Sequence, residues 1–176
     1  MNNIQAVEDL LRVIADMLWV SYDDFDAEEW SYAGWDDIEE AYAWFELGWI
    51  DPELAFEWYD ADWEYRELAY DWYMAGWENP KEAVAWYNAG WEDPEDALGW
   101  RRKGWDDPDE AIYWHDAGWE IPEDALEWYN AGWENPYDAF ECYASGWRDP
   151  EAALAWKRRG FDNPIEALEN FEGGNV

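Results

Sequence analysis

The stretch Gly-Trp-Glu-Asp-Pro-Glu-Asp-Ala at residues 90–97 is the clearest copy of a motif that returns at every fourteenth position. A fixed short period indicates a stacked repeat array, in which each unit buries its apolar face only against its neighbours. The tryptophan slot of the motif is filled nine times in succession, and Phe161 takes the next place. These tryptophans are Trp35, Trp49, Trp63, Trp77, Trp91, Trp105, Trp119, Trp133 and Trp147.

The motif predicts one short helix per unit. An Asp or Asn before proline favours an N-cap, and proline fits the first helical position because its missing N–H is no loss there. The glycine predicts a left-handed helix end, and the following tryptophan suits the apolar position of a Schellman closure. A helix of about ten residues is too short to persist alone, so stacking must hold it. The predicted N-caps are Asp51, Asn79, Asp93, Asp107, Asn135, Asp149 and Asn163.

Two further slots predict the core of the array. One slot holds alanine in every unit from Ala41 to Ala167, which indicates the closest contact between helices. The slot three positions later holds tryptophan from Trp44 to Trp156, except for Cys142. We therefore expect two tryptophan ladders and an alanine seam.

The period sets the expected domain organisation. Eleven units that start between residues 20 and 160 cover residues 20–173, and they predict an all-α superhelical solenoid of 14-residue single-helix repeats. In the unit at residue 62, Asp62, Tyr65 and Arg66 replace the glycine, the cap and the proline. Residues 1–19 show helical apolar spacing without the repeat, which predicts an N-terminal capping helix or, alternatively, a helix that forms a homodimer. Residues 174–176 should fray.

Charge bounds the function. The 176 residues include 45 acidic and 10 basic residues, for a net charge of −35. Such a chain repels nucleic acid and anionic membranes and attracts basic surfaces. One cysteine excludes a disulfide framework, and the sequence shows neither a secretory signal pattern nor an apolar run that could cross a bilayer. We therefore expect a soluble cytoplasmic protein.

Residues typical of catalysis are few. The single histidine, His115, takes a slot that tyrosine fills in other units, and Cys142 takes a tryptophan slot, so packing is the simpler role for both. The acids at Asp24, Asp26 and Glu28 have the spacing of calcium ligands, but Glu29 stands where that loop needs glycine. We expect no enzyme activity, no cofactor and no metal.

Basic residues gather in two triplets, Arg101-Arg102-Lys103 and Lys157-Arg158-Arg159, which lie four repeat units apart in the same slot. At a helix C-terminus they would complement the helix dipole. The alternative is that they clamp onto acidic units elsewhere in the array or in a second chain.

Two resemblances follow from these features. The helix piece at residues 82–90, Glu-Ala-Val-Ala-Trp-Tyr-Asn-Ala-Gly, resembles tetratricopeptide and Sel1-type repeats, which implies an α-solenoid, although those families use helix pairs and longer periods. In charge and size the chain is similar to the acidic DNA-mimic inhibitors of phages and mobile elements. That likeness implies an inhibitor that occupies the DNA site of a restriction enzyme or CRISPR-type nuclease.

The leading functional hypothesis is therefore a non-enzymatic DNA mimic that blocks the nucleic-acid site of a basic, DNA- or RNA-binding protein, without contacting nucleic acid or membrane itself. A repeat scaffold or chaperone for basic proteins or peptides is one alternative, and a halophilic acidic protein is another. The expected phosphate-mimicking carboxylates are Asp36, Asp37, Glu39, Glu40, Asp51, Glu53, Glu57, Asp60, Asp106, Asp107, Asp109, Glu110, Glu120, Glu123, Asp124 and Glu127.

Overall fold

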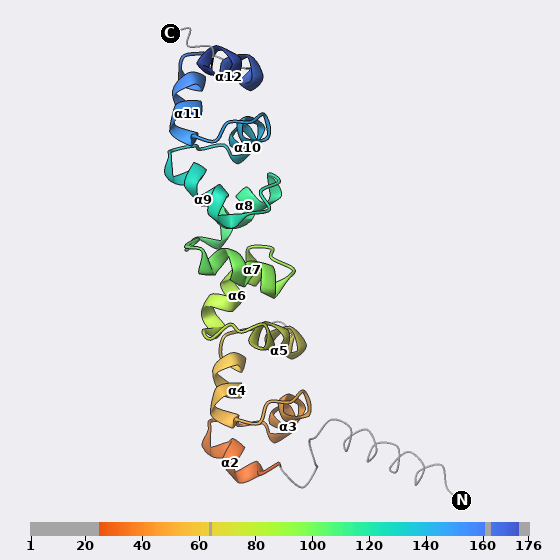
Figure 1. Ribbon diagram of the computed structural model, residues 1–176. Coiled ribbons are helices and arrows are strands. Elements are labelled where there is room, and N and C mark those ends of the chain that lie inside the picture. Colours follow the sequence, from red (N-terminus) through yellow and green to blue (C-terminus); the bar gives the residue numbers. More distant parts are fainter. Residues whose placement is uncertain (1–24, 64, 161–162, 173–176) are drawn as a thin grey trace, which may run out of the picture. The chain divides into compact units, whose positions relative to one another are not determined.

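The computed structural model describes residues 25–63, 65–160 and 163–172, and over these residues the chain forms eleven helices and no strand (Figure 1). All eleven predicted units therefore contain a helix, usually of nine residues. The expected N-terminal helix at 1–19 and the tail at 174–176 lie outside the described residues. The helices are α2 (Ala27–Tyr32), α3 (Ile38–Glu46), α4 (Pro52–Tyr59), α5 (Arg66–Met74), α6 (Pro80–Asn88), α7 (Pro94–Arg102), α8 (Pro108–Asp116), α9 (Pro122–Asn130), α10 (Pro136–Ala144), α11 (Pro150–Arg158) and α12 (Pro164–Glu172).

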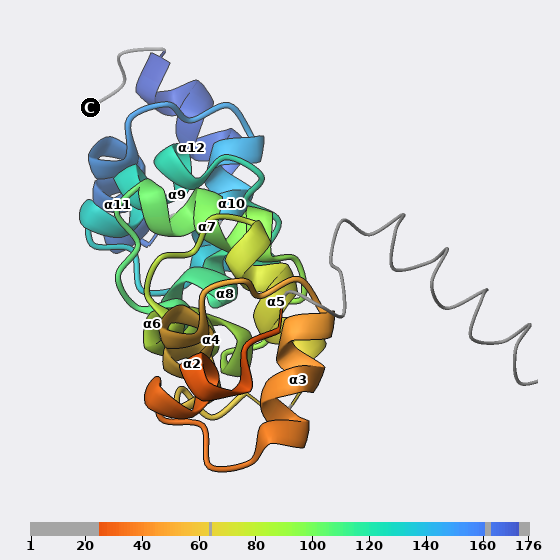
Figure 2. The same cartoon turned by 90° about the horizontal axis from the view of Figure 1, so that it is seen from below.

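The chain divides into two compact units, Met1–Val84 and Ala85–Val176, with the boundary inside α6. In the first unit, α2 packs against both α3 and α4, and Figures 1 and 2 both show α2 beside α4. In the second unit, α10 packs against α9 and α11 and also against α8 and α12. Helices α2 and α10 therefore each contact the next helix in the chain and the helix after that one. The sequence period contains one helix, whereas the packing layer contains two consecutive helices.

The helix ends confirm the predicted capping. The side chain of Asp93 accepts hydrogen bonds from the backbone N–H groups of Glu95 and Asp96 at 2.9 and 3.1 Å. Each of the other predicted N-caps also accepts at least one backbone N–H from the first turn of its helix. At the opposite end of α2, the N–H of Gly34 bonds to the carbonyl of Ser31 and the N–H of Trp35 to that of Trp30, which is the Schellman pattern.

Packing between units also follows the motif. Every alanine of the seam from Ala41 to Ala167 is buried. Within each compact unit the two tryptophan slots alternate in space, so the two ladders predicted from sequence merge into one. In the second unit the ring centroids of Trp91 and Trp100 lie 5.7 Å apart, and those of Trp100 and Trp105 lie 5.3 Å apart. The series continues at similar spacing to Trp133.

A repeated hydrogen bond joins consecutive units. The indole N–H of the first tryptophan of a repeat unit donates to the carbonyl of the proline that begins the helix of the next repeat unit. Trp119, for example, donates to Pro136 of α10 at 3.2 Å. The same bond forms at Trp35, Trp91, Trp105, Trp133 and Trp147. Each of these indole N–H groups is thus satisfied by the first helical residue of the next unit, as buried polar groups require.

The repeat unit that starts at residue 62, which lacks the glycine, the cap and the proline of the motif, breaks this pattern. Asp62 stands in the glycine slot with a φ of 70°, a left-handed conformation that costs an L-residue energy. The helix begins at Arg66 rather than at proline, and Tyr65 supplies no side-chain cap. Trp49, whose indole would meet the carbonyl of residue 66, keeps a buried N–H with no hydrogen-bond partner in the described part of the chain.

Candidate partner-binding surface

The sixteen carboxylates singled out from sequence divide by what they contact. Three of them, Asp37, Asp51 and Asp107, are helix N-caps whose side chains accept two backbone N–H bonds each. A capping carboxylate stays exposed on the surface, but one of its oxygens is already engaged in holding the helix end.

Glu40 and Glu110 serve the core as well as the surface. The Oε1 atom of Glu110 accepts the indole N–H of Trp114, one helical turn later, at 3.1 Å. Glu40 does the same for Trp44 at 3.1 Å and also pairs with Arg66 at 3.3 Å. These acids satisfy the second tryptophan of their unit. Where the slot holds Leu54, the N–H of Trp58 is buried without a partner among the described residues.

Four more of the sixteen carboxylates form a hydrogen bond or an ion pair with a side chain elsewhere in the repeat. Asp124 accepts a hydrogen bond from the hydroxyl of Tyr143 at 2.7 Å, and this bond raises the pKa of the phenol because the neighbouring carboxylate disfavours its ionisation. The remaining three form ion pairs. These are Asp60 with Lys81, Asp106 with Arg101, and Glu123 with Lys103.

The basic triplets contribute inter-helix ion pairs. Lys103 follows α7 and pairs with Glu123 on α9, while Lys157 on α11 pairs with Asp138 on α10 at 2.7 Å. The hydrogen bond from Lys103 holds the pKa of Glu123 below its ordinary value. Each triplet lies at a helix C-terminus. One lysine of each triplet also forms an ion pair with an acidic residue of another helix in the second compact unit, as the clamp hypothesis expects.

Seven of the sixteen carboxylates are exposed and have no side-chain partner within the part of the chain that the structure describes. They occupy recurring slots, either directly after the core tryptophan, at the second helical residue, or in mid helix. Four lie in the first compact unit and three in the second. They are Asp36, Glu39, Glu53 and Glu57, and Asp109, Glu120 and Glu127.

Sequence reasoning omitted further members of this set. Glu92 and Glu134 occupy the same slot as Glu120, directly after a core tryptophan, and both are exposed with no partner among the described residues. The signal that could have identified them is the slot itself. Charge summed over whole units favours the most acidic units and hides a position that is acidic in nearly all of them.

His115 lies against the aromatic core, and Cys142 lies within it. The ring of His115 lies 5.0 Å from that of Trp91, and its Nε2 and Nδ1 atoms lie 3.3 and 3.4 Å from Asp96 and Asp116. Cys142 is buried, and burial raises the pKa of its thiol to about 11, so the nucleophilic thiolate is disfavoured. Across the described residues no cluster of His, Cys, Asp and Glu is arranged to hold a metal ion.

Comparison with protein-family models, with curated proteins and with solved structures finds no match to this chain. None of the helices in the described ranges combines the length and apolarity that a bilayer crossing needs. The carboxylates and the repeat that carries them are therefore the features that bear on function.

Proposed function

We propose that this protein is a non-enzymatic DNA mimic that blocks the nucleic-acid-binding surface of a basic protein. The observation that carries the proposal is a set of exposed, partner-free carboxylates at recurring slots of a stacked repeat. Because the slots recur once in every repeat unit and alternate helices pack together within a compact unit, carboxylates of one slot recur on neighbouring helices of that unit.

The density of charge supports the proposal. Stacked helices lie about 10 Å apart, and duplex DNA carries about six charges over about 10 Å of its axis. A net charge of −35 over 176 residues amounts to about 5.6 negative charges for each layer of two repeat units, if a layer advances by one helix spacing. Averaged over the chain, the negative charge for two repeat units is close to that of duplex DNA, and it ranges from −10 over residues 20–47 to −1 over residues 132–159.

The test is a capture experiment with two elution steps. The immobilised chain is mixed with bacterial lysate, and bound proteins are released first with duplex DNA and then with salt. The proposal expects discrete proteins in the DNA step, because mimic and DNA would occupy one surface. A scaffold for basic proteins instead predicts release by salt alone. A halophilic protein predicts no specific capture and unfolding in dilute buffer.

Matched amide variants locate the surface. One variant removes three candidate charges of the second unit through Asp109→Asn, Glu120→Gln and Glu127→Gln. The control removes three exposed carboxylates that lie in other slots of the same compact unit, through Asp96→Asn, Asp116→Asn and Glu166→Gln. Both variants change the net charge equally. The proposal expects weaker capture and a smaller salt dependence for the first variant than for the control. Equal effects would show that net charge alone governs binding, and they would exclude a specific role for the candidate residues.

A further inference from the structure

Two apolar side chains depart from the repeat at slots that face solvent. Tyr32 occupies a slot in which most other units place a charged or amide residue, such as Glu46 or Asn130. Ile50 occupies the slot after the core tryptophan, which is acidic in the other units except for Tyr22 and Arg148. Tyr32 is 89% exposed and Ile50 is 78% exposed, the highest values among the large apolar side chains described. The repeat thus shows that folding requires neither residue to be apolar.

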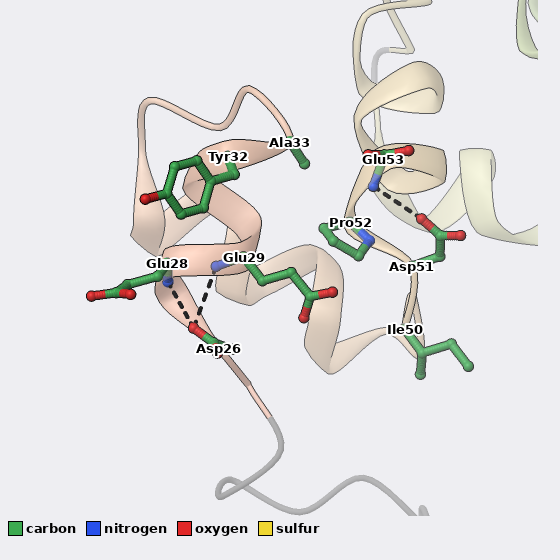
Figure 3. Close-up of a pocket in the computed structure, with 9 residues that line it drawn as sticks. All are labelled: Asp26, Glu28, Glu29, Tyr32, Ala33, Ile50, Asp51, Pro52 and Glu53. Carbon is green, nitrogen blue, oxygen red and sulfur yellow. Dashed lines mark hydrogen bonds between the residues drawn. The ribbon is translucent and has the colours of Figure 1, made fainter.

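Both side chains line the same open groove. This groove, of about 760 Å³, lies in the first compact unit between α2 and the segment that leads into α4. Figure 3 shows Tyr32 on one side and Ile50 on the other, with the carboxylate of Glu29 between them in this view. Two departures from the motif, in different repeat units, therefore meet at one surface.

The charge around the groove is of one sign. Asp26 and Asp51 cap α2 and α4 (dashed lines in Figure 3). Glu28, Glu29 and Glu53 line the groove with carboxylates that are exposed and have no partner among the described residues. None of the described residues that line the groove is basic.

We propose that this groove binds a basic segment of the partner protein, in which an apolar side chain lies between arginines or lysines. The apolar side chain would pack against Tyr32 or Ile50, and the cations would meet the free glutamates. The inference rests on the proposed function and deepens it. Carboxylates steer a basic partner from a distance, whereas a small apolar centre supplies short-range affinity that a row of phosphates lacks.

Residues 1–24 of the same chain are a poorer occupant. They contain five acidic residues and one arginine, so the groove's free carboxylates would repel them. A basic partner segment gains from the same carboxylates. Charge complementarity therefore selects the partner over the chain's own N-terminal segment.

The test uses two labelled eight-residue peptides with equal charge, one alternating arginine with leucine and the other arginine with serine. Binding to the full chain is followed by fluorescence anisotropy near physiological salt. We expect the leucine peptide to bind roughly tenfold more tightly, as burial of one apolar side chain allows. The double variant Tyr32→Asn with Ile50→Asn should remove this preference and leave the serine peptide unaffected. Equal binding of the two peptides, or a preference that survives the double variant, would overturn the proposal.

Met74 provides the matched control. It occupies the same slot as Tyr32 in another unit and is 63% exposed, so Met74→Asn changes an exposed apolar side chain away from the groove. That variant should keep the tenfold preference. A photoreactive phenylalanine analogue at position 32 should crosslink to the leucine peptide, and exclusive crosslinking to residues 1–24 would contradict the proposal. Failure of duplex DNA to release captured proteins would refute the mimic function and leave the peptide preference standing.

Discussion

The same substitution, glycine to alanine, should have opposite effects at two positions of the second compact unit. Gly118 ends α8 with a φ of 104°, and a Cβ atom built there would lie 3.1 Å from Cε1 of Phe140. Gly99 lies inside α7 with a helical backbone and has nothing within 4 Å of the added Cβ. The contrast isolates backbone conformation from the chemistry of the substitution.

The expected magnitudes follow from these surroundings. Gly118→Ala forces an L-residue into a left-handed conformation at a cost of about 1–2 kcal/mol and also displaces the Phe140 ring. Because alanine restricts the unfolded chain, about 0.4–1 kcal/mol is regained. These two terms leave a net loss of about 0–1.6 kcal/mol in the free energy of unfolding, and overpacking against the Phe140 ring should add about 1–3 kcal/mol. Gly99→Ala should instead stabilise by about 0.5–1 kcal/mol, since alanine is the better helix former.

Urea unfolding followed by circular dichroism and tryptophan fluorescence measures both variants. Gly160→Ala is the control for crowding, because its φ is 92° and no atom lies within 4 Å of the added Cβ. Its loss should be smaller than that of Gly118→Ala. If Gly118→Ala and Gly99→Ala shift the transition in the same direction, the assignment of the glycine slot to left-handed helix ends is refuted.

Three further predictions concern single contacts. Trp119→Phe should lower the free energy of unfolding by about 1 kcal/mol more than Trp49→Phe, because only the indole of Trp119 donates a hydrogen bond to the next unit; urea unfolding of both variants checks this. Lys103→Met should raise the pKa of Glu123 toward its ordinary value in an NMR titration. In the parent chain, the stabilisation from this lowered pKa is present near neutral pH and is lost as pH falls through it; an unchanged pKa in the variant would exclude the pair. Cys142 should react with a disulfide reagent at about pH 8 far more slowly in the folded chain than in urea, because a pKa of about 11 leaves little thiolate.

The local structure was predictable because each motif position acts within its own helix. Asp93 caps α7 whatever the rest of the chain does, and a glycine in the left-handed region ends a helix without reference to tertiary structure. The sequence therefore predicts all eleven helices and the N-caps of seven of them. The reduced regularity around Asp62 was also predictable, because it lacks the motif's glycine.

Packing between helices was less predictable because it depends on crossing angles. The contact between α8 and α10 stacks one layer of two consecutive helices on the next, yet no residue spacing in the sequence indicates it. The same geometry brings the indole of Trp119 to the carbonyl of Pro136 and merges two predicted ladders into one. Both features need the positions of two units at once.

The negative charge of the candidate surface was predictable from the sequence, but the carboxylates that form the surface were not. Glu110 and Glu120 are equivalent as charges in the sequence. In the structure Glu110 satisfies the indole of Trp114, whereas Glu120 has no side-chain partner among the described residues. Which carboxylates remain available is decided by neighbours in the same helix and in helices one or two units away. The groove at Tyr32 required the structure for the same reason.

The most direct test of the account is competition for one captured protein. That protein is purified and bound to a labelled DNA duplex, and the chain is added while fluorescence anisotropy and a native gel follow the complex. The account predicts that the chain displaces the duplex completely, that no complex containing all three forms, and that the salt dependence of displacement falls in the Asp109, Glu120 and Glu127 amide variant. A stable complex of chain, protein and DNA would contradict it, because the chain would then bind a surface other than the one that holds DNA.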